Sequence, residues 1–290
     1  YSKGAKSTIV LRGRADVDIP ANDTLTIHLP QFKMQEGYDY YVNFSGEQSW
    51  NQYPLGDCAI AQVATTPKKA KVEFEVNAES GIIEKYKVNG VDYIADGFGL
   101  RPNYWRAPID NDYGNGAPAR WQAWKVYGKE NKPAEVTDQM VEENRVVKVV
   151  YNLEDLGCSN VVTYTIEPSG ILTVEAQMSE ASFKEAPRYG VRWRMPQEFA
   201  NVRFYGRGPW ENYCDRKDGA QFAIYSCTVD DMYVPYVRPQ ENGHRVDTRW
   251  LEIKNAKGRG LVIHAVGTPF EFNALHNSVE DFDAEESTAP

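Results

Sequence analysis

Histidine is scarce in this chain, which has four in 290 residues. They are scattered along the sequence as His28, His244, His264 and His276. No His-x-x-x-His or His-Glu-x-x-His spacing occurs, and such a spacing is what sets two imidazoles on one face of a helix for a metal ion. The sequence therefore predicts no dedicated transition-metal site, and we assign no metal-binding residues.

Cysteine is equally rare, and the four cysteines lie far apart at Cys58, Cys158, Cys214 and Cys227. They form no Cys-x-x-Cys pair, which argues against a redox motif or a zinc site. A chain of this length can bury enough apolar surface to fold without disulfides. We therefore expect reduced thiols.

Long hydrophobic runs and an excess of positive charge are also missing. No apolar stretch approaches the roughly 20 residues that a membrane-spanning helix needs, and the first residues show no signal-peptide core. The formal net charge is −9, which gives no electrostatic attraction to nucleic acid or to an anionic membrane. We expect no nucleic acid and no membrane as partners, and a neutral or polar partner fits better.

The common nucleophile motifs are absent as well, since the sequence has no Gly-x-Ser-x-Gly elbow and no Ser-x-x-Lys. Gly206 and Gly208 follow a predicted strand, but Pro209 comes next and no helix begins there. A phosphate cradle needs the N-terminus of a helix. We therefore interpret these two glycines as turn residues.

Strand patterns dominate what is present. Six segments alternate or are rich in β-branched and aromatic residues: 72–76, 146–153, 160–166, 171–178, 191–195 and 270–274. Asn89 followed by Gly90 is the strongest short signal for a hairpin turn. Only residues 117–127 indicate a short helix, and so few helices argue against an α/β barrel. The predicted fold class is all-β with antiparallel strands.

A polar and basic stretch with a proline, residues 64–71, predicts a domain boundary. The first domain, residues 1–66, has strand candidates at 8–11, 25–29, 38–44 and 58–63. This is short for a closed sandwich, which takes about seven strands. The second domain, residues 71–290, is expected to form a large sandwich of two extended antiparallel sheets.

Two segments in the second half have the composition of polar loops on a rigid scaffold. Residues 205–216 (YGRGPWENYCDR) and 234–245 (VPYVRPQENGHR) place ionic, amide and aromatic side chains between glycines and prolines. Such side chains suit sugar hydroxyls and the apolar faces of sugar rings. The candidate carbohydrate-binding residues are Trp210, Glu211, Arg238, Glu241 and His244.

The carboxylates in these segments have two interpretations. Glycoside hydrolysis needs two carboxyl groups about 5 to 10 Å apart, and Glu211 with Glu241, or Asp215 with Glu241, are possible pairs. The alternative is that they brace the loops through salt bridges with neighbouring arginines. Four arginines stand close enough in the sequence for this role: Arg207, Arg216, Arg238 and Arg245. The sequence favours bracing.

A third segment, Asp110-Asn-Asp112, superficially matches the opening of a calcium loop. It lacks the alternating ligand spacing and the closing glutamate of such a loop. We interpret these short side chains as caps for backbone amides in a tight loop.

Four motifs together identify a resemblance. Residues 104–114 (YWRAPIDNDYG), 206–216, 232–245 (MYVPYVRPQENGHR) and 247–251 (DTRWL) are similar to the C-terminal part of the large multidomain β-galactosidases of glycoside hydrolase family 2. The resemblance covers roughly residues 71–285. It implies that residues 71–290 form a galactose-mutarotase-like β-supersandwich, truncated at its end. Residues 1–66 resemble the latter part of the immunoglobulin-like β-sandwich that precedes that domain.

The resemblance also implies how the function is divided. In that family both catalytic glutamates lie in a central α/β barrel, and nothing in this sequence resembles the barrel. We therefore expect a C-terminal fragment with no catalytic residues and no cofactor of its own, since Mg²⁺ and a monovalent cation belong to the barrel. The parent enzyme hydrolyses terminal non-reducing β-D-galactose residues with retention. The fragment is expected to shape the substrate pocket beside the barrel and to extend the contacts of a homo-oligomer, in the cytoplasm or periplasm of a bacterium.

Two alternatives come from other classes of protein. The first is a free-standing carbohydrate-binding module that uses the five candidate residues on an open sheet. The second is an aldose-epimerase-like enzyme, which would need a general acid and a general base facing each other across a sugar ring. His244 and Glu241 are the pair that the sequence offers for that reaction. This second alternative is an analogy between folds.

Overall fold

The computed structural model describes residues 8–14, 19–20, 22–35, 38–45, 50–55, 69–130, 132–179 and 185–283. The strands are β1 Tyr41–Ser45, β2 Trp50–Pro54, β3 Val72–Val76, β4 Ile83–Val88, β5 Val91–Asp92, β6 Arg101–Asn103, β7 Glu135–Val141, β8 Asn144–Leu153, β9 Cys158–Ile166, β10 Leu172–Met178, β11 Gly190–Arg192, β12 Asn201–Gly208, β13 Gln221–Thr228, β14 Arg245–Thr248, β15 Trp250–Lys254, β16 Gly260–His264 and β17 Phe270–Phe272. The α-helices are α1 Asp110–Gly114, α2 Ala117–Arg120, α3 Gln122–Glu130 and α4 Val279–Phe282.

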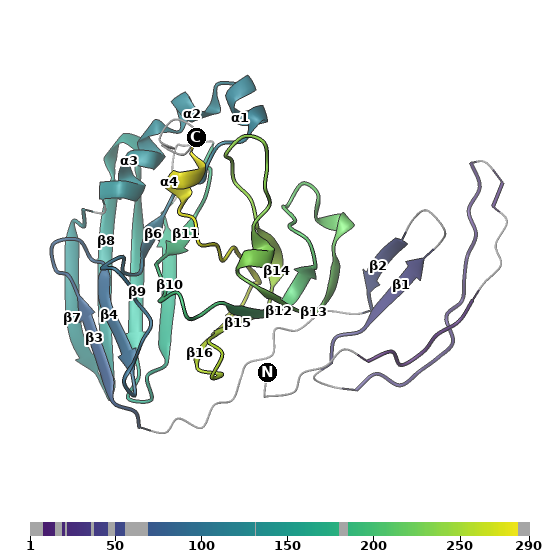
Figure 1. Cartoon of the computed structure of the whole chain (residues 1–290), viewed down its shortest axis with the longest axis horizontal. Coiled ribbons are helices and arrows are strands. Elements are labelled where there is room, and N and C mark those ends of the chain that lie inside the picture. Colours follow the sequence, from purple (N-terminus) through teal and green to yellow (C-terminus); the bar gives the residue numbers. More distant parts are fainter. Residues whose placement is uncertain are drawn as a thin grey trace.

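The described strands pair in six antiparallel sheets, which confirms the predicted all-β class. Two of these sheets have four strands each, in the orders β10-β9-β8-β7 and β13-β12-β15-β16. The first lies at one end of the molecule, the second in the middle, and the β1–β2 pair at the opposite end (Figure 1). The supersandwich and immunoglobulin-like assignments remain predictions.

The sheet β7–β10 buries one face in the larger hydrophobic core. Every second residue of β9 is buried, as the period of two along a strand requires. Val162 and Tyr164 on this strand are fully buried against β8 residues such as Val147 and Val149. Trp124 of α3 closes the same core and is 1% exposed. The helix predicted at 117–127 is therefore present as α2 and α3, and its tryptophans hold it on the sheet.

The second four-stranded sheet carries its own core. Phe204 of β12 is fully buried among Leu251, Ile253 and Phe272, and its ring centroid lies 5.2 Å from that of Phe272. Burying one such side chain stabilises the fold by about 1.5 to 3 kcal/mol. Strand β12 is the strand from which one of the two polar loops continues, so the loop starts from a rigid base.

The Asn89-Gly90 hairpin is confirmed. Both residues have positive φ, 50° and 83°, as the two central residues of a type I′ turn require. The turn aligns Val88 with Val91 across the β4–β5 pair.

The interpretation of Gly206 and Gly208 as turn residues is wrong, because both lie inside β12. A Cβ atom on Gly206 would stand 2.8 Å from Thr248 Oγ1 and 3.0 Å from Thr248 Cα. A Cβ atom on Gly208 would stand 2.8 Å from the ring of Tyr225. Glycine is required here by close approach of other side chains, which is a recognised role of glycine in strands.

Two of the predicted N-terminal strands do not form. Residues 8–11 and 25–29 are irregular and exposed, with Ile9 at 69% and Leu25 at 45% exposure. Within the part of the chain that the structure describes, neither segment pairs with a strand. The strand predicted at 38–44 is present as β1. The strand predicted at 58–63 lies outside the described residues, as do residues 64–68 of the predicted boundary.

Three cysteines lie in the described part of the chain, and Cys158, Cys214 and Cys227 are free thiols, as expected. Cys58 is outside it. No helix in the described ranges has the length and apolar character to span a membrane.

Candidate functional site

The two polar loops rise from neighbouring strands and are joined at their bases. One follows β12, and the other precedes β14. The buried side chain of Asn212 accepts a hydrogen bond from Val246 N at 3.0 Å and donates to the Trp210 and Arg207 carbonyls at 2.9 and 3.0 Å. Its own backbone N–H donates to the His244 carbonyl at 2.9 Å. One amide side chain therefore fixes both loops, which we call the loop surface (residues 209–216 and 233–244).

Glu211 is held inside the loop surface. One carboxylate oxygen accepts hydrogen bonds from Arg216 at 2.6 Å and from the Tyr236 hydroxyl, and the other accepts from Gly243 N at 2.8 Å. The side chain is only 7% exposed. Both oxygens are engaged with donors of the two loops, so Glu211 braces one loop against the other, as the sequence favoured.

Glu241 is braced as well, but by a different arginine from those expected. Its Oε1 accepts hydrogen bonds from Arg188 at 2.7 Å and from Asn273 at 3.2 Å. The Glu241 side chain is 3% exposed and that of Arg188 16%. A buried carboxylate without a cationic partner would be strongly unfavourable, so this pair ties the loop to the segment that leads into β11.

His244 is engaged with partners other than Glu241. Its Nε2 donates to Glu271 on β17 at 2.8 Å, and its ring stacks on that of Tyr213 with centroids 5.1 Å apart. The hydrogen bond from His244 lowers the pKa of Glu271, and partial burial opposes this shift. Burial, with Glu241 and Glu211 nearby, raises the pKa of Tyr213. Each member of the pair that an epimerase would use is thus engaged with another side chain, His244 with Glu271 and Glu241 with Arg188.

The two remaining candidates lie at the outer edge of the loop surface. Trp210 is 80% exposed, so it is not a core residue. Arg238 forms a salt bridge with Asp110 at 3.1 Å, and its guanidinium lies 4.2 Å from the centre of the Tyr113 ring. Arg238 thereby connects the loop surface to helix α1.

The segment that superficially matched a calcium loop is a capped helix start. Asp112 accepts a hydrogen bond from Ile109 N at 2.8 Å and forms a salt bridge with Arg106 at 2.6 Å. This confirms the interpretation of Asp112 as a cap. Within the described ranges, no group of three or more His, Cys, Asp or Glu side chains is placed to hold a metal ion.

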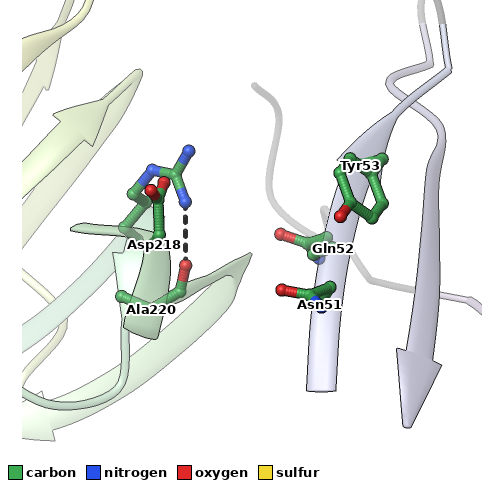
Figure 2. A pocket seen from close by; sticks show the side chains of 6 residues that line it. Asn51, Gln52, Tyr53, Asp218 and Ala220 are labelled. Carbon is green, nitrogen blue, oxygen red and sulfur yellow. Dashed lines mark hydrogen bonds between the residues drawn. The ribbon is translucent and has the colours of Figure 1, made fainter. Parts of the chain in front are cut away.

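A pocket of about 250 Å³ lies away from the five candidates. It is lined by Asn51, Gln52, Tyr53, Arg207, Asp218 and Ala220. Figure 2 shows strand β2 on one side and Asp218 with Ala220 on the other. The Gln52 amide both donates to the Phe222 carbonyl at 3.1 Å and accepts from Phe222 N at 2.5 Å. The pocket thus lies at a polar contact between the N-terminal strands and β13.

Three residues that contact the loop surface were missed by sequence reasoning: Arg188, Glu271 and Asn273. Each stands at least 27 positions from the candidate it contacts. The sequence around them carries no motif that pairs them with Glu241 or His244. Asn273 and Glu271 do lie in a segment with a correct strand prediction, which was the only available signal.

These features define an all-β protein of antiparallel sheets, in which two polar loops form a braced, partly aromatic surface. Residues 68–289 match the family described as "Beta galactosidase small chain". The chain belongs to this beta-galactosidase small chain family.

Curated proteins similar to this chain carry the same name. A beta-galactosidase of Priestia megaterium is 37% identical over 200 residues, which cover 69% of this chain and 19% of that protein. A beta-galactosidase of Streptococcus thermophilus is 36% identical over 202 residues, covering 68% and 19%. One from Vibrio cholerae is 28% identical over 283 residues, covering 83% and 27%. The chain thus spans about a fifth to a quarter of the length of these relatives.

Proposed function

We propose that this chain is the small-chain portion of a β-galactosidase, an enzyme that hydrolyses terminal non-reducing β-D-galactose residues. The chain serves as a non-catalytic wall, and the two catalytic glutamates lie in a barrel outside it. The loop surface docks on that catalytic portion and limits the pocket for the galactoside. Contacts between copies of the assembled enzyme, a homo-oligomer, also involve this domain.

The observation that carries the proposal is the engagement of the two carboxylates. A glycosidase needs one carboxyl group to transfer a proton and another to attack or to activate water. Glu211 spends both oxygens on Arg216, Tyr236 and Gly243, and Glu241 is buried against Arg188. Carboxylates locked in this way stabilise loops, and they do not have the access to sugar that catalysis requires.

The apolar side chains on the same surface support docking. Trp210 is 80% exposed, Tyr233 45%, Tyr236 38% and Val237 107%. Tyr236 and Trp210 belong to loops that Glu211 joins directly. Soluble proteins seldom expose large apolar groups together unless a partner covers them. Arg238, which is already paired with Asp110, adds a polar rim of the kind that surrounds the centre of protein interfaces.

A domain that closes one side of the pocket can raise the rate of hydrolysis without contacting the reacting bond. Excluding water lowers the local dielectric constant, and the electrostatic contacts of catalytic groups inside the pocket become stronger. Removing the wall therefore weakens catalysis even where the catalytic glutamates are intact.

Complementation tests the proposal. The chain is co-expressed with the catalytic portion of a family member, such as the Priestia megaterium enzyme. The region matched by this chain is first removed from that enzyme. We expect galactoside hydrolysis to require both polypeptides. Substituting Trp210→Ser or Val237→Asp should weaken the association at least about tenfold, since residues at the centre of an interface carry most of its affinity. Val266→Asp is the matched control, because Val266 is also 80% exposed but lies outside the loop surface.

Two results would contradict the proposal. One is association that is unaffected by both loop substitutions. The other is a chain that binds galactose saturably by itself through Trp210, which would favour a free-standing carbohydrate-binding module.

A further inference from the structure

Three arginines surround one aromatic ring on the β6–β11 sheet. Their guanidinium carbons lie 4.0 Å (Arg101), 5.2 Å (Arg192) and 5.5 Å (Arg194) from the centre of the Phe98 ring. Arg101 and Arg192 stand directly opposite each other in the antiparallel register, so both side chains leave the same face of the sheet. Arg194 follows two residues later, just beyond the end of β11. We call this group the arginine cluster (Phe98, Arg101, Arg192 and Arg194).

Such an arrangement is unfavourable unless negative charge compensates it. Like charges directly opposite each other destabilise a sheet, and an arginine cannot escape by losing its proton. Burial and the neighbouring charge of Arg192 both lower the pKa of Arg101. The two guanidinium groups therefore repel each other in a partly desolvated position.

The carboxylates nearby contact the three arginines unequally. Arg192 pairs with Glu280 of α4 at 2.9 Å. Arg194 reaches Asp96 at 3.3 Å, but both side chains are at least half exposed, and such pairs contribute little.

Arg101 has no carboxylate contact within the part of the chain that the structure describes. Its Nε donates to the Gly99 carbonyl at 3.0 Å. Glu280 and Glu84 both favour its charge electrostatically, but Glu280 is paired with Arg192 and Glu84 accepts a hydrogen bond from Asn77. The Nε of Arg192 is buried and likewise meets no acceptor among the described residues.

Arginines that brace this fold are satisfied differently. Arg145 donates twice to Asp138 and once to the Phe74 carbonyl. Arg207 donates to Asp247 and to the carbonyls of Lys217 and Ala220. A guanidinium has five donors in a planar fork, and these two use their forks on carboxylate and carbonyl oxygens. Among the described residues, Arg101 donates through its Nε alone. A bracing role therefore does not account for its terminal Nη donors.

We propose that the arginine cluster binds a small oxyanion of the phosphate or sulfate class. The terminal donors of Arg101, which meet no acceptor among the described residues, and the unpaired Nε of Arg192 supply the hydrogen bonds to the anion. This suits a tetrahedral anion better than the single planar face of a carboxylate. The site lies on the β6–β11 sheet beside α4 (Figure 1) and does not involve the residues of the loop surface.

The test is a titration of the whole 290-residue chain with inorganic phosphate and with sulfate at constant ionic strength, using chloride as the reference. Calorimetry and the thermal midpoint are both recorded. We expect saturable binding and a rise in the midpoint with either oxyanion. Arg101→Gln should weaken binding about 10- to 100-fold, because it removes charge-assisted hydrogen bonds. Arg120→Gln is the matched control, since Arg120 pairs with Glu185 at a separate exposed site.

Each other outcome overturns the proposal. If the wild-type chain shows no oxyanion effect beyond chloride, the site does not exist. If Arg101→Gln and Arg120→Gln respond as the wild type does, the anion binds elsewhere. If Arg101→Gln changes self-association and not anion binding, the cluster receives a carboxylate of a second copy instead. Should Arg101→Gln fold poorly, Arg194→Gln gives the same comparison, because Arg194 is half exposed.

Discussion

The loop surface and the arginine cluster use the same residue type in opposite ways. The two buried glutamates of the loop surface are each paired with an arginine, Glu241 with Arg188 at 2.7 Å and Glu211 with Arg216 at 2.6 Å. In the arginine cluster, Arg101 faces a second arginine across two paired strands. A paired arginine fixes loops in one conformation. An arginine without a carboxylate keeps its donors for something outside the fold.

The largest difference in stability should be that between substitutions at a paired arginine and at an arginine of the cluster. Arg188→Gln leaves the buried Glu241 carboxylate without its cation, which should cost about 3 kcal/mol of unfolding free energy. Arg101→Gln removes a charge that repels its neighbour, and we expect a loss of about 1 kcal/mol or less, from the contacts with Phe98 and Gly99. Urea unfolding in chloride buffer measures both. Equal losses would show that the two arginines have the same role.

A second substitution tests the base on which the loop surface stands. Gly206→Ala should lower the free energy of unfolding by about 2 kcal/mol. The new methyl group would lie too close to the backbone of Thr248, where β12 packs against β14. Gly190→Ala, also in a strand, has no atom within 4 Å of the new methyl group and serves as the control. A loss at Gly190 as large as that at Gly206 would contradict the close-approach explanation.

Glu211→Gln should have a smaller effect, about 1 to 2 kcal/mol, since the amide keeps some hydrogen bonds but loses the charge that pairs with Arg216. Asp215→Asn, in the same loop but exposed, should change stability by less than about 0.5 kcal/mol. Denaturant midpoints of the two variants provide the comparison. If Glu211→Gln is silent, the carboxylate does not brace the loops.

The smallest expected effect is on the pH dependence of stability. The hydrogen bond from His244 lowers the pKa of Glu271 in the folded chain. A carboxylate with a lowered pKa stabilises the fold above its unfolded pKa and loses this contribution as the pH falls through the folded pKa. Because Glu271 is half exposed, the contribution should stay below about 1 kcal/mol. Glu271→Gln should flatten the fall in stability from neutral to acidic pH, and an unchanged profile would contradict the assignment.

The parts of the fold that the sequence predicted are those set by neighbouring residues. The turn at Asn89 and Gly90 needs positive φ at two adjacent positions, and these residue types supply it locally. The alternation in β9 follows from burial on one face of the sheet. Strand β7 was missed because its residues are nearly all exposed, so its pattern does not alternate.

The parts that could not be predicted depend on distant residues. The glycines of β12 are explained by Thr248 and Tyr225, which no local pattern reveals. The partner of Glu241 is Arg188, 53 positions away, although four arginines stand closer in the sequence. The candidates Trp210 and His244 were found by composition, but only the fold distinguishes the exposed indole from the buried imidazole.

The most direct test of the account is galactoside hydrolysis by the purified chain, assayed with a chromogenic β-D-galactoside beside the variant Glu241→Gln. Because both catalytic glutamates are proposed to lie in a barrel outside this chain, we expect no turnover above buffer for either protein, and turnover only after the catalytic portion is added. Hydrolysis by the chain alone that disappears in Glu241→Gln would contradict it.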